Sequence, residues 1–293
     1  MAQQAQDTSA PAMLNMTIRP LGPVMGAEII GMDLSRPLPA AATGRIQDAF
    51  NQYKVLCFRD QELTMEQLVA FSRTWGPLVE HTMPGQLRDG ITEINIATNA
   101  NAEGKPSGQH PDLTAMRWHT DRSWRVEPAL ATILYGLEVP SAGGDTLVSN
   151  CTKAYEGLPE DMRRRVDPLR AIHSVEYSRK TGDGPAATEY ELRNHPPTPH
   201  PLARKHPATG RKALFCGCHA WMIEGWPERE GREFLDQMQA FATRDEYLYR
   251  HHWRRHDLLM WDNRCTTHAA TPYDTAKELR TMYRTVVAGG PTC

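Results

Sequence analysis

Trp118-His119-Thr120-Asp121 is the stretch that constrains this chain most, because a matching His268 follows far downstream at the end of residues 261–268. In an extended segment, residues i and i+2 point to the same side. His119 and Asp121 would therefore face one way and Thr120 the other. Two imidazoles and one carboxylate can hold a metal on one face and leave its other face open, an arrangement suited to Fe(II) oxygen chemistry.

The pattern His-x-Asp occurs twice in the sequence. His110-Pro111-Asp112 also fits it, but a proline removes a ladder hydrogen bond, and this segment lies in a polar loop. A clear strand pattern at residues 130–137 follows residues 118–121, so we prefer His119 and Asp121. Taken by itself, His268 has an alternative interpretation, because a buried histidine can have a purely structural role in which hydrogen bonds satisfy its ring in the core. A strand pattern and a turn lead into His268, and this context favours a metal ligand.

Two arginines follow His268 within a run suited to a strand. Arg280 and Arg284 are four residues apart, so a strand would place both on one face. An inward-pointing guanidinium needs an anion. Two of them beside an open metal site indicate two carboxylates, one on a cosubstrate and one on a substrate. Structural salt bridges to Asp or Glu are the alternative for each arginine.

The charge balance and composition exclude several function classes. The chain has 33 basic and 35 acidic residues and no basic stripe, which argues against nucleic acid as a partner. No apolar run approaches the roughly 20 residues needed to span a bilayer, so we expect no membrane partner. Residues 1–11 lack the pattern of a signal peptide, and we expect a cytoplasmic protein. The six irregularly spaced cysteines are expected to be buried free thiols.

The pattern of elements predicts a disordered tail over residues 1–15 and one domain over residues 16–293. Two stretches rich in Gly, Pro and polar residues, 84–117 and 179–211, are predicted to be lid insertions. Many short strands with helical insertions predict a mainly β fold, a sandwich or barrel wrapped by helices. The expected strands are 55–58, 93–96, 130–137, 145–148, 246–253, 257–261 and 280–288, and the expected helices are 40–53, 64–75, 152–158, 159–170 and 228–243.

With these residues assembled, the chain resembles the taurine dioxygenase and 2,4-dichlorophenoxyacetate dioxygenase family of Fe(II)/2-oxoglutarate enzymes. The resemblance runs from about Ile18 to Ala288. It implies a double-stranded β-helix, a jelly roll of the cupin-like kind. The motifs that carry it are Gly26-Ala27-Glu28-Ile29, Gly31-Met32-Asp33-Leu34, residues 71–77, Trp118-His119-Thr120-Asp121, Gly143-Gly144-Asp145-Thr146, and Trp261-Asp262-Asn263-Arg264 with His268.

The resemblance also implies roles for individual residues. His119, Asp121 and His268 correspond to the iron ligands. Thr146 and Arg280 resemble the groups that hold the distal carboxylate of 2-oxoglutarate. A forked guanidinium can bind that carboxylate in a bidentate way, and a hydroxyl can add a further bond.

Four further residues resemble substrate-binding positions. Arg284 resembles a second arginine that meets the substrate's acidic group. The gap between His268 and Arg280 is one residue longer than in the taurine enzymes, which leaves open which arginine has which role. His81 matches a substrate-contacting histidine. Residues 173–178 and 219–223 resemble the aryloxyalkanoate side of the family, so Tyr177 and His219 are candidate pocket residues.

Three functions follow as expectations. The first is a dioxygenase that uses Fe(II), 2-oxoglutarate and O2 to hydroxylate a small organic anion, an aryloxyalkanoate or aryl carboxylate, with ether cleavage where the attacked carbon bears an ether oxygen. The second is a taurine or alkylsulfonate dioxygenase. The third is of another class, a jelly-roll zinc hydrolase or metal-binding protein, since zinc accepts the same ligands. The arginine pair argues against the third. We expect a homo-oligomer.

Overall fold

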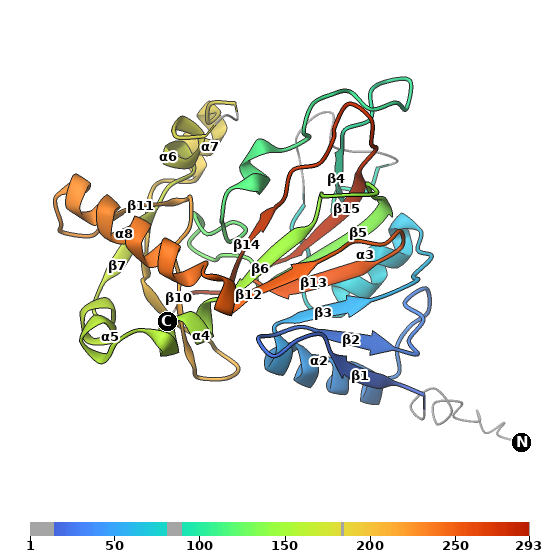
Figure 1. The fold of residues 1–293 in the computed structure, drawn as a ribbon, viewed down its shortest axis with the longest axis horizontal. Helices are drawn as coiled ribbons and strands as arrows, with labels where there is room; N and C mark the ends of the chain where they lie inside the picture. Colours follow the sequence, from blue (N-terminus) through green and yellow to red (C-terminus); the bar gives the residue numbers. More distant parts are fainter. Residues whose placement is uncertain (1–14, 81–89, 183–184, 293) are drawn as a thin grey trace, which may run out of the picture.

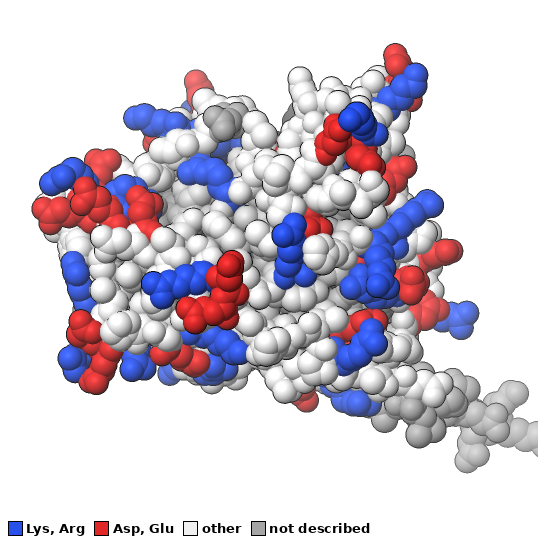
Figure 2. Space-filling model, viewed as in Figure 1, with Lys and Arg blue, Asp and Glu red and all other residues white. Residues whose placement is uncertain are grey.

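The structure is a computed structural model, and it describes residues 15–80, 90–182 and 185–292. Residues 1–14 of the predicted tail and the candidate His81 lie outside the described residues. No helix in the described part of the chain is long and apolar enough to cross a membrane. On the face drawn in Figure 2, acidic and basic side chains are interspersed, as the near-zero net charge predicts.

The largest sheet has seven strands in the order β1-β2-β3-β13-β5-β15-β4 (Figure 1). Neighbouring strands are antiparallel except β2 and β3, which are parallel. The strands are β1 (Thr17–Pro20), β2 (Ala27–Ile30), β3 (Val55–Phe58), β13 (Leu258–Asp262), β5 (Ala131–Glu138), β15 (Thr281–Val287) and β4 (Asn95–Thr98). The predicted central strands are therefore confirmed. Their near-continuous apolar runs suit a sheet that is buried on both faces.

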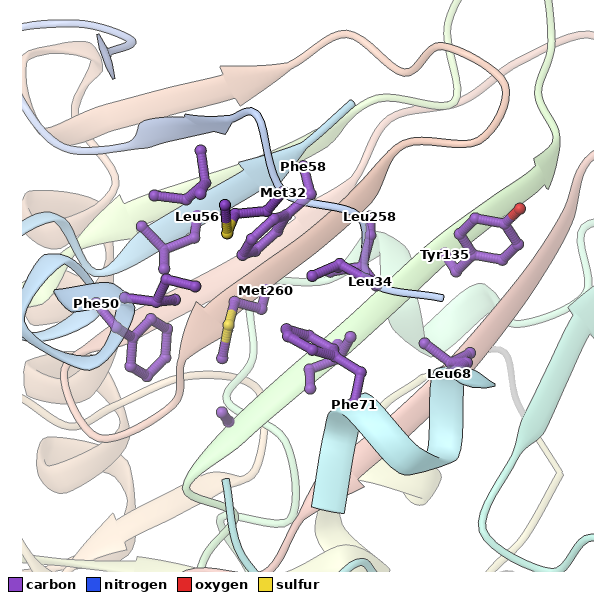
Figure 3. Packing of buried hydrophobic residues seen from close by; sticks show 14 of the residues in the cluster. Met32, Leu34, Phe50, Leu56, Phe58, Leu68, Phe71, Tyr135, Leu258 and Met260 are labelled. Atoms are coloured by element: carbon purple, nitrogen blue, oxygen red, sulfur yellow. The ribbon is translucent and has the colours of Figure 1, made fainter. Parts of the chain in front are cut away.

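Two helices cover one face of this sheet, α2 (Ala40–Tyr53) and α3 (Met65–Arg73). Figure 3 shows their shared core, in which Phe50 and Phe71 meet Phe58 and Met260 from the strands. The Phe58 and Phe71 rings make an edge-on contact at 5.6 Å. The spacing of Thr64 and Gln67 is typical of a capping box, and the structure forms one at the start of α3, since the two side chains each accept from the other's backbone N–H.

The opposite face of the large sheet packs on a three-stranded sheet of order β12-β6-β14, made of β12 (Leu248–His251), β6 (Thr146–Asn150) and β14 (Thr266–Ala270). Alternation along β13 divides its side chains between the two layers. Leu258 and Met260 join the helix side, whereas Leu259 and Trp261 join a cluster that includes Val148 of β6. Trp261 thereby reaches the second sheet, where the candidate ligand His268 lies.

The remaining elements form a third part with its own apolar cluster. They are η1 (Leu113–Met116), α4 (Cys151–Gly157), α5 (Glu160–Val166), β7 (Arg170–His173), α6 (Val175–Lys180), α7 (Glu189–Asn194), β8 (Thr198–Pro201), β9 (Ala203–Lys205), β10 (Lys212–Leu214), β11 (Ala220–Ile223), α8 (Glu228–Ala242) and η2 (Asp245–Tyr247). The predicted insertion 179–211 contains α7, β8 and β9, and β8 pairs with β7. Five cysteines in the described residues are free and buried, as predicted.

Two element boundaries differ from expectation. The helix predicted over 159–170 ends at Val166, and a strand begins at Arg170. Pro168 explains this end, because proline disfavours helix at the residue before it and lacks the N–H that a helix needs. Within the strand predicted over 246–253, only β12 (Leu248–His251) is a strand, because η2 occupies the first residues of that range.

Candidate active site

The three candidate metal ligands converge although they come from distant parts of the chain. His268 lies in β14, and His119 pairs with it across an isolated bridge with backbone N–H···O distances of 3.0 and 2.8 Å. Their Nε2 atoms lie 3.8 Å (His119) and 3.5 Å (His268) from the carboxylate oxygens of Asp121. All three side chains are buried, and their ligand atoms lie within 4.8 Å of one another. This spacing suits one ion bound to all three.

Neighbouring groups fix the orientation of two of these residues, His119 and Asp121. Nδ1 of His119 lies 2.7 Å from the carbonyl oxygen of Arg117, so Nδ1–H donates there and leaves Nε2 free for a metal. The Thr132 hydroxyl donates to Oδ2 of Asp121. Asn263 in turn donates to the Thr132 oxygen at 2.9 Å. Sequence reasoning missed Thr132 and Asn263, although Asn263 lies in a quoted motif.

The protonation states also suit metal binding. Burial, together with the nearby His119, lowers the pKa of His268 to about 3, so its imidazole is neutral near pH 7. Burial alone would raise the pKa of Asp121, but His268 and the Arg284 guanidinium outweigh it and hold that pKa well below its ordinary value. Neutral imidazole and ionised carboxylate are the forms that bind divalent metals.

Arg280 is a buried cation without an ion pair among the described residues. The residue is only 6% exposed, and the carboxylate whose charge acts on it, Asp145, forms its ion pairs with Arg250 and His252. Burial lowers the pKa of Arg280 to about 10. Its Nε donates to the Gly144 carbonyl at 3.3 Å. Thr146, two residues beyond Gly144, is buried at the start of β6 and accepts from Trp253 Nε1 at 3.1 Å.

Two polar groups beside Arg280 lack hydrogen-bond partners among the described residues. They are the Tyr273 hydroxyl and Nε2 of His110, whose rings lie 5.7 Å apart. Burial and the Arg280 charge both lower the pKa of His110, whereas burial raises the pKa of Tyr273 against the opposing effect of the Arg280 charge. Buried polar groups are rarely left unpaired, so these two atoms and the Arg280 guanidinium, which has no ion pair among the described residues, fit a bound carboxylate. Sequence analysis missed this role for both, and set His110 aside only as a metal ligand.

Arg284 faces the centre from β15. Its Nη1 lies 3.7 Å from Oδ1 of Asp121, and its side chain is 27% exposed. Nε of Arg284 is buried and has no partner in the part of the chain that the structure describes. The carboxylate that Arg284 contacts is therefore itself a candidate metal ligand, and a further anion could bind the guanidinium.

The two candidate pocket residues occupy different surroundings. His219 is buried, and its ring makes edge-on contacts with His119 at 6.2 Å and Trp124 at 4.5 Å. It thus lies beside the centre. Tyr177 stacks on Trp221 at 6.2 Å and lines a cavity of about 270 Å³ with Trp118, which precedes His119. The structure places Tyr177 in no direct contact with the three described ligand candidates.

Two other buried groups combine histidine, aspartate and cysteine, namely Cys57-His251-Asp257 and His206-Asp262-Cys265. In each of them an arginine already neutralises the carboxylate. Arg59 pairs with Asp257, and Arg264 binds both oxygens of Asp262. These groups are therefore internal ion pairs that tie strands together, whereas the carboxylate of Asp121 lies between two imidazoles.

Known proteins resemble this chain over nearly its whole length. Residues 17–286 match the family described as "Taurine catabolism dioxygenase TauD, TfdA family". The 2,4-dichlorophenoxyacetate dioxygenase of Cupriavidus pinatubonensis is 33% identical over 91% of this chain and 96% of its own. The (S)-phenoxypropionate/alpha-ketoglutarate-dioxygenase of Sphingobium herbicidovorans is 35% identical, over 94% and 95%. A crystal structure of AAD-2 with Mn(II) and N-oxalylglycine superposes with a TM-score of 0.84, at 33% identity over 95% of this chain and 98% of that one.

Proposed function

Because this chain belongs to the taurine catabolism dioxygenase TauD, TfdA family, we propose that His119, Asp121 and His268 bind its iron. The chain is a 2-oxoglutarate-dependent non-haem iron dioxygenase, which uses Fe(II), 2-oxoglutarate and O2. Support for the three ligands comes from their buried convergence. Further support is that no arginine among the described residues binds Asp121 as tightly as Arg264 binds Asp262.

Arg280 and Thr146 bind the distal carboxylate of 2-oxoglutarate in this proposal, and Arg284 serves the substrate. The observation that carries the assignment is the burial of Arg280 without an ion pair among the described residues. Tyr273 and His110 lie beside it with unpaired polar atoms that a carboxylate would satisfy.

Each protein group then has a definite task. Iron held by His119, Asp121 and His268 would activate O2, the oxidant whose two oxygen atoms go to succinate, formed by decarboxylation of 2-oxoglutarate, and to the hydroxylated substrate. The Arg117 carbonyl and the Thr132 hydroxyl orient the ligands His119 and Asp121. The Arg280 guanidinium holds the cosubstrate. Apolar rings such as Trp261, 4.6 Å from the His268 ring, keep water away.

The substrate that we propose is a small organic acid with an aromatic ring, an aryloxyalkanoate or aryl carboxylate. The guanidinium of Arg284 suits its acid group, and the His219–Trp124 pair offers aromatic surface near the centre. If the attacked carbon bears an ether oxygen, the hydroxylated product collapses and the ether is cleaved. A taurine or alkylsulfonate substrate is the second candidate, because a guanidinium also binds a sulfonate and the family description names taurine.

We further propose that the two packed sheets form a double-stranded β-helix. The support is the apolar cluster between them and the site at their junction, with His268 on one sheet and Arg284 on the other. The division into a tail, one domain and two lids stays a prediction. Free buried cysteines support a reducing, cytoplasmic location. The predicted homo-oligomer can be checked by light scattering during size-exclusion chromatography.

Succinate release from 2-oxoglutarate, with Fe(II) and ascorbate, tests the function. We expect release to depend on an aryloxyalkanoate or arylacetate, and taurine and alkylsulfonates are screened beside them. His119→Ala should abolish both turnover and iron binding. If no substrate in the screen elicits succinate, or if His119→Ala binds iron normally, the assignment is wrong.

A second experiment separates the two arginines. Arg280→Met should raise the KM for 2-oxoglutarate at least tenfold, a change on the order of one lost charged hydrogen bond, and should affect the substrate KM far less. Arg229→Met removes an exposed arginine from α8 and serves as the control. The reverse pattern, with the substrate KM raised more, would mean that Arg280 and Arg284 have exchanged roles.

A further inference from the structure

The side chain of Thr146 lies between the two packed sheets, on the same face as the candidate ligand His268. Thr146 and Val148 are two residues apart in β6, so their side chains share one face of the strand. Val148 stands directly opposite His268 in β14 and belongs to the apolar cluster between the sheets. Opposite residues of an antiparallel pair point to the same side. The buried Thr146 hydroxyl therefore faces the layer that contains the candidate centre.

The indole of Trp253 determines how this hydroxyl is used. Trp253 is buried in the same apolar cluster, and its Nε1–H donates to Thr146 Oγ1 at 3.1 Å. An indole nitrogen can only donate, so the Thr146 oxygen is the acceptor and its own hydrogen must point elsewhere. Within the described part of the chain, the structure records no acceptor for that hydrogen. Since buried polar groups are rarely left unpaired, we expect a bound group to accept it.

Trp253 is itself held by polar side chains on the side away from Thr146. Its ring meets the ring of His251 edge-on at 4.6 Å. The two nitrogens of His251 lie 3.0 Å from the Tyr249 hydroxyl and 3.2 Å from a carboxylate oxygen of Asp257. The backbone N–H of Arg254, the next residue after Trp253, donates to the same oxygen of Asp257 at 2.8 Å. These contacts fix the position of the indole.

We propose that Trp253 is a positioning residue for the cosubstrate, because its indole N–H directs the Thr146 hydroxyl hydrogen toward the distal carboxylate of 2-oxoglutarate. The inference rests on the proposed function, in which Thr146 and Arg280 bind that carboxylate. Gly144 links the two groups, since its carbonyl accepts from Arg280 two residues before Thr146. A hydroxyl that donates to a charged carboxylate becomes a stronger acceptor, so the two hydrogen bonds of Thr146 strengthen each other.

Titration calorimetry with N-oxalylglycine on the Mn(II)-loaded protein tests this without turnover. Thr146→Val, which loses the donor, should weaken binding at least tenfold. Trp253→Phe keeps an aromatic ring but loses the N–H, and it should weaken binding about three- to tenfold, because the hydroxyl is then free among its three staggered positions. In a Thr146→Val background, Trp253→Phe should have no further effect. Trp226→Phe, the same exchange beside another apolar cluster, is the control and should bind as the wild type.

A second measurement leaves Trp253 unchanged. In Zn(II)-loaded protein with isotope-labelled tryptophan, binding of N-oxalylglycine should move one indole N–H proton resonance downfield, since the new bond of Thr146 strengthens the bond from Trp253. Thr146→Val, in which the indole N–H has lost its acceptor, should lack this shift. If no indole resonance of the wild type moves when the analogue binds, the proposal is wrong.

The outcomes of the calorimetry separate this inference from the proposed function. Wild-type affinity in Trp253→Phe, beside a loss in Thr146→Val, overturns the role of Trp253 alone. An equal loss from Trp253→Phe with and without Thr146 also overturns it, because the indole would then act on the pocket by another route. Wild-type affinity in Thr146→Val would instead contradict the proposed cosubstrate contact of Thr146, and the role of Trp253 would be refuted with it.

Discussion

At the scale of single residues, the proposed ligand His119 is held from both sides. Its Nδ1 faces the Arg117 carbonyl, and its backbone pairs with His268. Asp121 is held in a similar way, because Thr132 donates to one of its oxygens while the other lies 3.8 Å from Nε2 of His119. The hydrogen bond that orients the His119 ring therefore leaves its Nε2 atom free.

Removal of the Thr132 hydroxyl should weaken the metal site without unfolding the protein. Thr132→Val keeps the shape of the side chain but leaves Asp121 and Asn263 without their shared partner. We expect the Fe(II) affinity to fall about 10- to 100-fold, as measured by anaerobic Fe(II) titration. Thr43→Val, which loses a hydroxyl contact within α2, is the matched control. An unchanged affinity in Thr132→Val would show that this bond does not orient Asp121.

Gly144 is a residue at which a single methyl group should disturb cosubstrate binding. Its φ is +65°, and an added Cβ would lie 2.7 Å from Pro140 Cγ and 3.3 Å from Cδ and Nε of Arg280. Gly144→Ala should destabilise the fold by about 1–2 kcal/mol and raise the KM for 2-oxoglutarate several-fold by displacing Arg280. Gly22→Ala, whose Cβ meets nothing within 4 Å, is the control. A normal KM in Gly144→Ala would mean that Arg280 tolerates displacement.

At the scale of elements, packing decides whether a helix tolerates a larger residue in place of glycine. Gly44 of α2 lies on the solvent side, whereas α8 approaches β11 so closely that Gly231 is buried against this strand. A Cβ on Gly231 would lie 2.8 Å from the backbone nitrogen of Ile223, but one on Gly44 would meet nothing within 4 Å. The same residue type therefore has opposite roles in the two helices.

The two glycines give a paired stability prediction. Gly44→Ala should stabilise the protein by about 0.5–1 kcal/mol, because alanine has the higher helix propensity and gains no clash. Gly231→Ala should destabilise it by about 1–3 kcal/mol, since β11 cannot yield without breaking its pairing. Urea unfolding of both variants checks this. A stabilised Gly231→Ala would show that α8 can move away from the sheet.

At the scale of the whole molecule, the site lies where the two packed sheets meet, so it is buried together with many histidines. Among the described histidines that are fully buried, burial lowers the pKa of five, to about 4 for His200 and about 3 for His268; the others are His173, His219 and His251. On unfolding, all five recover an ordinary pKa near 6.5. Below that pH the unfolded state therefore binds more protons than the folded state.

Stability should accordingly be highest above about pH 6.5 and fall as the pH is lowered toward 4. Each of these histidines contributes up to about 1.4 kcal/mol per pH unit between its two pKa values. The lowered pKa values of Asp121 and Asp262 act in the same direction, but only at more acidic pH. Urea midpoints of the metal-free protein between pH 8 and 4 check the slope, which His200→Gln should reduce. A flat profile between pH 7 and 5 would contradict the burial of neutral histidines.

The sequence by itself determined the central strands, the capping box at Thr64, the free cysteines and the family. These follow from local patterns, because alternation, capping chemistry and motif spacing are encoded within a few residues. The approach of His119 to His268 could be anticipated only through the motifs of that family.

Only the tertiary structure decided which groups support the site. Thr132 and Tyr273 carry no local signal, and the pattern at His110 indicated only a possible metal ligand; the surroundings of all three are made by segments far apart in the chain. Whether a polar group is satisfied or left without a partner depends on the packing of both sheets. Burial distinguishes Arg280, the proposed anion site, from an ordinary arginine, and burial is a property of the folded molecule as a whole.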